Sequence, residues 1–279
     1  MFSYVLQRSV NSALTLCRHN HTQYLSVNNV DGTREITLNN DKTRNSLSLD
    51  MMSYLVEEIN RDKDNDSLRA IVLTAKGHVF SAGHNLKELQ ASSGVEQHKV
   101  IFDKATELMM SIVRSPVPVI AKVNGVVAAA GCQLVAQCDM AVCSETSKFS
   151  TPGANFGIFC STPGIAVGRS VPKSRAMYML LTGEAISAQE AYESGLVTKV
   201  VPADQLDKEV NNIIDKIKMK SRSVVSLGKE FYYKQIELGL SEAYKLGGEL
   251  MVKNVNMGDG QEGIKSFIEK RKPVWTHKQ

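Results

Sequence analysis

Residues 116–142 read PVPVIAKVNGVVAAAGCQLVAQCDMAV, and the rest of the chain is best interpreted from them. The apolar run from Val117 to Val123 is rich in β-branched residues and predicts a buried strand. Asn124-Gly125 predicts a turn after it. A helix of very small residues is expected next, with Ala128 to Gly131 near its start. Small side chains let another group approach the backbone, where the first N–H groups of a helix lack partners.

This small-residue helix start has two interpretations. Its N–H groups lie at the positive end of the helix dipole and would hold a developing oxyanion. Alternatively, the Ala/Gly cluster lets two backbones pack in contact, which short motifs of this kind do more often. These residues alone leave both interpretations open.

Composition places the chain among ordinary globular proteins. Its 279 residues are enough for one large or two small domains, with 43% hydrophobic and 22% charged residues. The net charge of +4 is spread along the chain without a dense basic stripe, so no nucleic-acid partner is expected. No apolar run approaches the length of a membrane span. The five cysteines lack paired spacing, so neither disulfides nor a metal site is expected.

The N-terminal residues differ from the rest. Residues 1–30 contain no acidic residue, while Arg8 and Arg18 alternate with serines and apolar side chains. That composition is typical of a mitochondrial transit peptide and predicts a targeting segment at residues 1–20 and a matrix location. The alternative is an irregular N-terminus without a targeting role.

The chain then begins with a strand pair. Residues 22–30 and 33–38 predict two strands joined across Asp31-Gly32, a strong hairpin signal. Ser48 is placed to cap a helix, and residues 69–75 predict a buried central strand. The order strand, strand, helix, strand favours an α/β fold.

A second small-residue loop lies around Gly83. Asn85 precedes Glu88 by three residues, the spacing of a capping box, so a helix is expected just after His84. The backbone at Gly83 would then form another loop before a helix N-terminus.

Three blocks together carry a specific resemblance: FSAGHNLKEL at 80–89, the stretch at 116–142, and KFSTPGANFGIFCSTPG at 148–164. They resemble the signature blocks of the crotonase (enoyl-CoA hydratase/isomerase) superfamily, and the resemblance spans roughly residues 22–275. It implies an α/β crotonase (ClpP-like) fold, a spiral of ββα units, over residues 21–200. A C-terminal helical region at 201–279 would then assemble a homotrimer or a dimer of trimers.

The resemblance also implies an acyl-CoA site. In the superfamily two backbone N–H groups hold the thioester oxygen, and the matching positions are His84 and Ala130. Coenzyme A is part of the substrate, so no separate cofactor and no metal are expected. The matched role of His84 uses its backbone, although an imidazole there also suggests acid/base chemistry. Coenzyme A is expected to bind at five residues: Arg44, Asn85, Leu86, Lys87 and Lys270. Alternatively, the cations among them, Arg44, Lys87 and Lys270, are solvated surface charges without a role in binding.

One departure from the family concerns the acids and bases. A hydratase of this family uses two glutamates, as acid/base work on water requires. The matching positions here are Gln133, which can orient water but not usefully accept its proton, and Gly153, which has no side chain. A third position, acidic in some relatives, is Ser161. The space at Gly153 is expected to admit a bulkier acyl group beside Cys160 and Ser161.

Two functional hypotheses follow. The first is a mitochondrial enzyme of fatty-acid metabolism, a lyase, isomerase or thioesterase that acts on acyl-CoA thioesters through the backbone oxyanion hole. The second is a non-catalytic acyl-CoA binder or regulator that has kept the fold and lost the acids. Ordinary enoyl-CoA hydration is doubtful under either hypothesis, and fold likeness alone does not decide between them.

Overall fold

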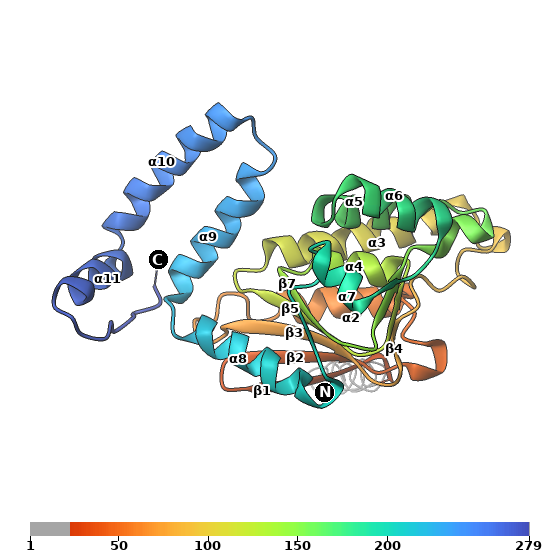
Figure 1. Ribbon diagram of the computed structural model, residues 1–279, viewed down its shortest axis with the longest axis horizontal. Helices are drawn as coiled ribbons and strands as arrows, with labels where there is room; N and C mark the ends of the chain where they lie inside the picture. The colour runs from red at the N-terminus through yellow and green to blue at the C-terminus, as the bar shows by residue number, and fades with distance from the viewer. Residues whose placement is uncertain (1–22, 279) are drawn as a thin grey trace, which may run out of the picture.

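A computed structural model describes residues 23–278, and its centre is a mainly parallel six-stranded sheet (Figure 1). The strand order is β1-β2-β3-β5-β7-β10, in which only β1 and β2 pair antiparallel. The strands are β1 Leu25–Val30, β2 Thr33–Leu38, β3 Ala70–Ala75, β5 Val119–Val123, β7 Met140–Ser144 and β10 Lys199–Val201.

A second, four-stranded sheet has the order β4-β6-β8-β9. Its strands are β4 Val79–Ser81, β6 Val126–Ala128, β8 Lys148–Ser150 and β9 Ile186–Ser187. The pairs β3 and β4, β5 and β6, and β7 and β8 each place one strand in the large sheet and the next in the small sheet, and each pair leads toward a helix. The chain therefore spirals through both sheets in repeated strand, strand, helix units.

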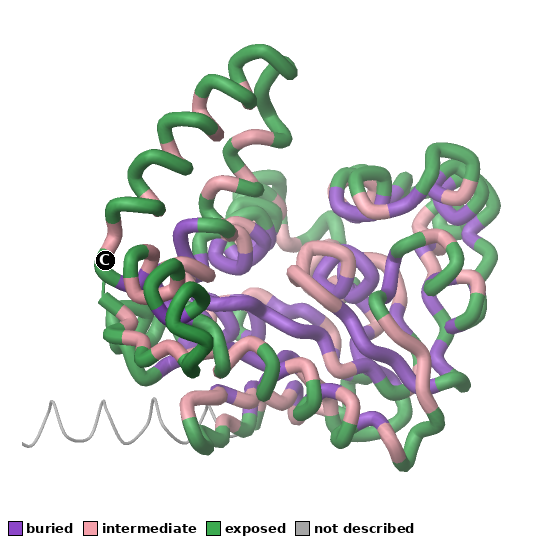
Figure 2. The backbone as a smooth tube through the Cα atoms, turned by 60° about the vertical axis from the view of Figure 1, so that its left-hand side comes forward, coloured by how far each residue is buried: buried purple, intermediate pink, exposed green. Residues whose placement is uncertain are grey.

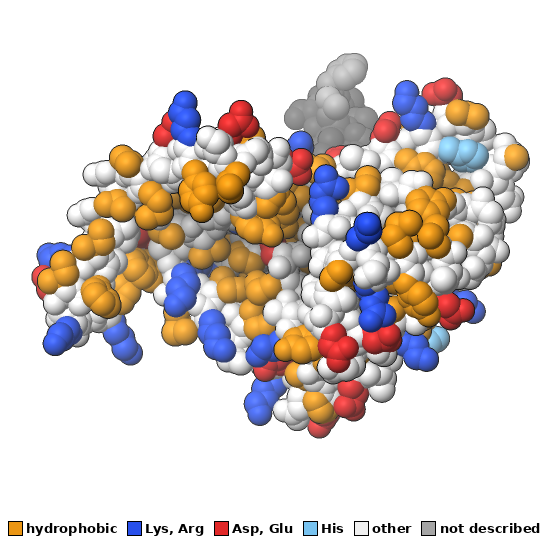
Figure 3. Space-filling model, turned by 45° about the horizontal axis from the view of Figure 1, so that its top comes forward, with side chains coloured by type: hydrophobic (Ala, Val, Ile, Leu, Met, Phe, Trp, Pro, Cys, Tyr) orange, Lys and Arg blue, Asp and Glu red, His pale blue; other side chains and the backbone are white. Residues whose placement is uncertain are grey.

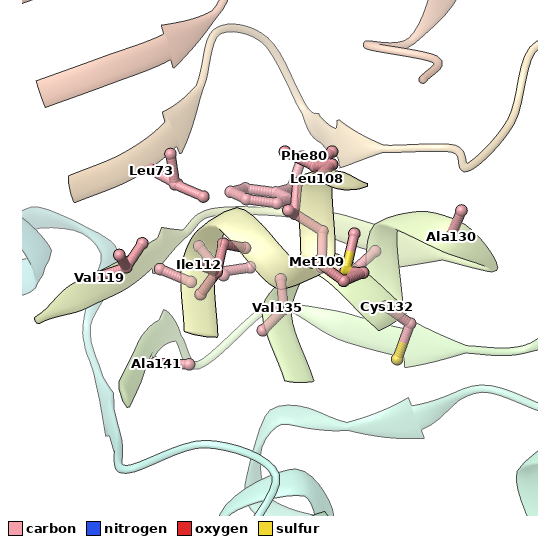
Figure 4. Close-up of a cluster of buried hydrophobic side chains, with 14 of the residues drawn as sticks. Leu73, Phe80, Leu108, Met109, Ile112, Val119, Ala130, Cys132, Val135 and Ala141 are labelled. Carbon is pink, nitrogen blue, oxygen red and sulfur yellow. The ribbon is translucent and has the colours of Figure 1, made fainter. Parts of the chain in front are cut away.

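Six helices belong to this spiral or cover it. They are α2 Leu49–Asn60, α3 Val95–Arg114, α4 Ala130–Gln137, α5 Ser161–Ser170, α6 Lys173–Thr182 and α7 Ala188–Glu193. Short 3₁₀ turns are η1 Asp41–Thr43, η2 Ala91–Ser93, η3 Pro152–Phe156 and η4 Ala203–Gln205. Leu108 and Ile112 of α3 pack with Val135 of α4 and Leu73 of β3 in the buried core (Figure 4).

The chain after β10 is helical, with α8 Leu206–Lys218, α9 Arg222–Gln235, α10 Leu240–Asn256 and α11 Gly258–Ile268. α8 covers the large sheet through Leu206, Val210 and Ile214. α9, α10 and α11 project from the core as an arm (Figure 1). The arm is largely exposed, whereas the strands are buried (Figure 2), and α10 has no buried residue.

Among the described residues, a part-buried ion pair joins the arm to the core. The Lys229 Nζ on α9 donates to Asp139 Oδ2 at 2.6 Å, and the Tyr233 hydroxyl donates to Asp139 Oδ1 at 3.0 Å. Asp139 also accepts the N–H of Val119 at 2.7 Å. The carboxylate therefore fixes the second half of α9 against the start of β5.

Several sequence predictions are confirmed. The hairpin pairs Val30 with Thr33 across Asp31-Gly32, and the run at 119–123 is a buried strand. Ser48 caps α2, its side chain accepting the N–H of Met51. The predicted transit peptide at residues 1–20 lies outside the described residues. Within the described residues, no helix has the length and hydrophobicity needed to span a membrane.

The prediction of a helix just after His84 is wrong. Residues 86–89 form turns, with the Glu88 N–H bonded to the Asn85 carbonyl at 3.0 Å. The Glu88 carboxylate accepts the first N–H of α2, that of Leu49, at 3.0 Å, and also the Asn85 amide at 3.2 Å. The capping-box pattern assigns Glu88 to a helix that would begin beside it, but Glu88 caps α2 instead.

The start of the small-residue helix is also displaced from the sequence prediction. Ala128 belongs to strand β6, because it pairs with Ser150 of β8, and α4 begins at Ala130. The expected order of strand, turn and helix therefore contains an additional short strand, β6, which is only three residues long.

Candidate functional site

The two small-residue loops meet in space. Gly83 has a φ of +89°, and a Cβ built on it would lie 2.8 Å from the Cβ of Ala129 and 3.0 Å from the nitrogen of Ala130. Gly131 is equally close to β4, since a Cβ there would lie 2.6 Å from the Ser81 carbonyl oxygen. Only glycine permits these approaches. The start of α4 is therefore pressed against the loop that carries His84.

Ala129 adopts a backbone conformation that is rare for a residue with a side chain. Its φ is +51° and its ψ is −120°. Its N–H donates to the Ser150 carbonyl at 2.9 Å, and its carbonyl accepts the Gln133 N–H at 3.1 Å. Strain of this kind persists only where the surrounding structure enforces it, and it concentrates at functional sites. The strained residue immediately precedes the first N–H of α4.

The N–H groups of His84 and Ala130 have no hydrogen-bond acceptor among the described residues. Ala130 is the first residue of α4 and so lacks an acceptor within the helix. At the His84 loop, the pairing with the Leu47 segment uses the Gly83 carbonyl, which accepts the Leu47 N–H at 2.8 Å. Both N–H groups are therefore available to a bound molecule.

Both residues line an apolar cavity of about 420 Å³. No acidic or basic side chain other than that of His84 is among the described residues of its lining. Leu86, Phe156, Ile158 and Phe159 are more than half exposed and form a hydrophobic rim. The lining consists of Ala82, His84, Leu86, Leu89, Phe102, Ala129, Ala130, Pro152, Gly153, Phe156, Ile158, Phe159, Cys160, Ser161, Thr162 and Pro163.

The imidazole of His84 contributes to this lining as well as the backbone. The Phe102 ring of α3 packs against it edge to face, with ring centroids 5.2 Å apart and an interplanar angle of 76°. Both ring nitrogens are buried from solvent. Burial lowers the pKa of His84, and the nearby backbone of Leu47 offsets part of that effect. The imidazole is therefore neutral at physiological pH.

The expectation of extra space at Gly153 is wrong. A Cβ on Gly153 would lie 2.1 Å from the Ile158 carbonyl oxygen and 2.7 Å from the Sγ of Cys160. The Gly153 N–H donates to that sulfur at 3.3 Å, and the Ile158 N–H donates to the Gly153 carbonyl at 3.0 Å. The segment from 153 to 160 folds back on itself and fills the volume that a side chain would need. Ser161 begins α5 directly after this segment and lines the cavity.

Two buried polar side chains belong to residues close in sequence to the lining but outside it. Gln133 is 6% exposed and Thr151 is fully buried. Neither the Gln133 Oε1 nor the Thr151 Oγ1 has a hydrogen-bond partner within residues 23–278. Gln133 is one helical turn beyond Ala129, and Thr151 directly precedes Pro152 of the lining. The structure does not bring the Gln133 side chain into the cavity lining itself.

The residues expected to contact coenzyme A fall into two groups. Leu86 is in the lining, and Asn85 and Lys87 share its turn, where the Asn85 Oδ1 accepts the Lys87 N–H at 3.2 Å. Exposed Arg44 is close by, since its carbonyl accepts the N–H of Ala82 at 3.0 Å. Lys270 follows α11 on the arm (Figure 1), and the structure does not bring it to this cavity.

Some lining residues were not anticipated from the sequence. Phe102 is 38% exposed on a helix whose apolar spacing identifies only the opposite, core-facing residues. Phe156 ends a short 3₁₀ turn and Phe159 follows it without regular structure, and such a segment has no periodicity that would signal the role of an aromatic residue. Within residues 23–278, no cluster of three or more His, Cys, Asp or Glu residues forms a metal-binding group.

A family model described as enoyl-CoA hydratase/isomerase matches residues 29–278. The chain therefore belongs to the enoyl-CoA hydratase/isomerase family. It is 53% identical over 270 residues to the mitochondrial enoyl-CoA hydratase domain-containing protein 3 of Xenopus laevis, covering 97% of this chain and 91% of that protein.

Solved structures agree with this assignment. The crystal structure of human enoyl-CoA hydratase domain-containing protein 3 is similar with a TM-score of 0.89 and 52% identity, covering 90% of this chain and 100% of that chain. An enoyl-CoA hydratase of Mycobacterium smegmatis is similar with a TM-score of 0.88 and 42% identity, over 90% and 98% of the two chains. The expected crotonase fold is confirmed.

Proposed function

We propose that the protein binds acyl-CoA thioesters in the 420 Å³ cavity, with the thioester oxygen between the N–H groups of His84 and Ala130. The observation that carries this proposal is the contact between Gly83 and the nitrogen of Ala130, which brings two unpaired N–H groups to one cavity. Fixed backbone donors stabilise negative charge on such an oxygen without reorganising during the reaction.

The cavity and its surroundings suit two different parts of an acyl-CoA ligand. The apolar lining suits an acyl chain, because burying hydrocarbon is favourable by about 25 cal/mol per Å². The exposed cations Arg44 and Lys87 suit the phosphates of coenzyme A outside the cavity. The proposal includes a role in fatty-acid metabolism, which such a ligand would suit, and a mitochondrial location, which the naming of the relatives supports.

The exposed arm suits a homo-oligomer. Its apolar residues include exposed Leu240, Tyr244 and Phe267, and hydrophobic side chains form several patches on the surface of the molecule (Figure 3). Large exposed apolar patches mark interaction sites. In a homotrimer or dimer of trimers these faces would be covered, and Lys270 would reach a cavity only as part of another copy.

Hydration by two carboxylates is not part of this proposal. Gln133 supplies a carboxamide, and the backbone around Gly153 leaves no room for the second acid. The absence of any carboxylate from the described lining favours a second candidate, an acyl-CoA binder without turnover.

The test is a binding and turnover panel with the full chain. Calorimetry would compare coenzyme A, saturated acyl-CoA, 2-enoyl-CoA and 3-hydroxyacyl-CoA, and mass spectrometry would follow the products. We expect acyl-CoA to bind more tightly than coenzyme A, and hydration of 2-enoyl-CoA to be absent. Equal affinity for acyl-CoA and free coenzyme A would contradict the role of the cavity.

Comparison with Gln133→Ala separates the two candidates. Turnover that collapses in this variant would identify Gln133 as a water-positioning residue. Tight binding without turnover, unchanged by Gln133→Ala, would identify the non-catalytic binder.

A further inference from the structure

The C-terminal tail after α11 turns back to the point where the arm leaves the core. The Trp275 Nε1 donates to the Met219 carbonyl, in the loop between α8 and α9, at 2.8 Å. The Asp259 carboxylate of α11 accepts the N–H groups of Thr276 and His277, at 2.8 and 3.0 Å. These bonds hold the His277 side chain at the first turn of α9.

The His277 ring serves there as a helix cap. Arg222 is the first residue of α9, and its N–H, which has no acceptor within the helix, donates to the Nδ1 of His277 at 3.2 Å. Nδ1 accepts a hydrogen bond only in the neutral imidazole with its hydrogen on Nε2. In the imidazolium both ring nitrogens carry a hydrogen, so the Nδ1–H would point at the Arg222 N–H. The cap therefore requires the neutral ring.

The charges around the ring also oppose its protonation. Its Nε2 lies 3.5 Å from the Arg69 Nη1, just before β3, and the Arg222 guanidinium of α9 is a second cation nearby. Asp259 of α11 and Asp66, in the loop before β3, act in the opposite direction. Burial and then Arg69 lower the pKa of His277, and the two carboxylates offset only part of this. The positive end of the α9 dipole acts in the same direction as the two arginines.

Arg69 is itself fixed beside the ring. Its Nη2 donates to the carbonyls of Lys218 and Lys220 at the end of α8. The Lys218 ammonium is paired with Asp31, in the hairpin between β1 and β2. A proton added to His277 would therefore place two cations in contact, without freedom for Arg69 to withdraw.

We infer that the C-terminal tail is an acid-released latch, in which protonation of His277 detaches residues 275–278 from the base of the arm while the core stays folded. The ion pair of Lys229 with Asp139, at 2.6 Å, holds α9 to the core without the tail. Because the folded-state pKa of His277 is lowered, the latch is closed above the ordinary value of 6.5 and opens as the pH falls through the folded value. The inference does not depend on acyl-CoA binding.

Trp275 is the only tryptophan of the chain and reports on the latch directly. Its ring packs on α11, where a Cβ built on Gly263 would lie 3.4 Å from it. The full chain is titrated from pH 7.5 to 4.5, and Trp275 emission, acrylamide quenching and far-UV circular dichroism are followed together. The emission should shift to the red and the quenching should rise, with a midpoint below pH 6.5, while the circular dichroism stays constant because the opening is local.

Two variants of His277 fix the latch in opposite states. His277→Asn keeps an amide oxygen that can accept the Arg222 N–H and does not titrate, so Trp275 should stay protected down to pH 4.5. His277→Arg carries a permanent cation, so Trp275 should be as accessible at pH 7.5 as it is in the wild type at pH 4.5.

His98→Asn is the matched control, since His98 is also half-buried and its Nε2 bonds to the Gln90 carbonyl, at 3.0 Å, in a contact that a protonated ring keeps. It should titrate like the wild type. Asp259 does not titrate in this range, because its pKa is lowered below 3.8.

A Trp275 signal that stays flat to pH 4.5 in the wild type would overturn the inference. A transition of equal size in the wild type and His277→Asn would also overturn it. Loss of circular dichroism in step with the Trp275 signal would show general acid unfolding in place of a latch.

Discussion

Gly83 packs directly against the backbone nitrogen of Ala130, so closely that a Cβ on Gly83 would lie 3.0 Å from it. The contact joins a loop after β4 to the first residue of α4, which are nearly fifty residues apart in the sequence. It explains the small residues of both loops, because larger ones would separate the two N–H groups. Close packing and oxyanion binding, which compete as interpretations of the sequence, are here compatible.

Substitution of Gly83 by alanine should weaken acyl-CoA binding at least tenfold. The new Cβ meets the Ala129 Cβ at 2.8 Å and pushes the two loops apart, and the φ of +89° adds strain. Isothermal titration with hexanoyl-CoA measures the effect.

Gly94→Ala is the matched control, since Gly94 has a φ of +80° and nothing within 4 Å of its Cβ position. It should destabilise the fold modestly and leave the affinity unchanged. Equal losses of affinity in both variants would attribute the effect to backbone strain instead of the separation of the loops.

Gly153→Ala should destabilise the protein by about 1–3 kcal/mol, the usual cost of overpacking. The Cβ would meet the backbone oxygen of Ile158, which cannot move away without shifting the loop. Urea unfolding measures this change. Gly168→Ala, in α5 with open space around it, should be neutral or stabilising.

The same crowding predicts the outcome of restoring both family acids. The double variant Gln133→Glu, Gly153→Glu should not hydrate 2-enoyl-CoA, because the second side chain cannot enter without rearranging residues 153–160. Hydration by this variant in a spectrophotometric assay would show that the loop opens readily.

Lys229→Met should destabilise the fold by about 3 kcal/mol, the lower end for breaking a buried pair, because it leaves the largely buried Asp139 carboxylate without its cation. The Lys229 Nζ also donates to the carbonyls of Ile112 and Val117. Lys234→Met on the same helix removes an exposed pair with Glu230 and should change stability by less than about 0.5 kcal/mol. Similar losses in denaturant unfolding for both variants would contradict this difference.

Asp259 should make the C-terminal tail sensitive to acid. Burial tends to raise its pKa, but hydrogen bonds from Ser221, Thr276 and His277 outweigh this and lower it. A lowered folded-state pKa means that the stabilisation is full above the unfolded value of about 4 and is lost as the pH falls through the folded value.

The unfolding free energies of the wild type and Asp259→Asn should therefore differ most near pH 7 and converge toward pH 2. A difference that stays constant from pH 7 to pH 2 would exclude this linkage.

Local patterns in the sequence predict much of the fold. The hairpin at Asp31-Gly32, the Ser48 cap and the strand at 119–123 depend on neighbouring residues, and all three are present. The helix expected after His84 fails because Glu88 bonds to α2, a partner far away in the sequence. Local spacing cannot reveal such a choice.

The candidate site divides in the same way. The block resemblance identifies His84 and Ala130, whose loops the structure brings into contact. The resemblance does not reveal that the space beside Gly153 is filled, because that depends on the backbone at Ile158 folding back against Gly153. Nor does it indicate Phe102 beside the imidazole, because that contact joins a helix and a loop through tertiary packing.

The Ala130 N–H, which we propose binds the thioester oxygen, is tested most directly by replacing that amide with an ester. Lactic acid at position 130 removes the N–H and keeps the methyl group. The affinity for hexanoyl-CoA should fall up to about tenfold, the value of one hydrogen bond. The affinity for S-hexyl-CoA, a thioether without the carbonyl oxygen, should not change. Unchanged binding of hexanoyl-CoA, or equal losses for both ligands, would contradict the account.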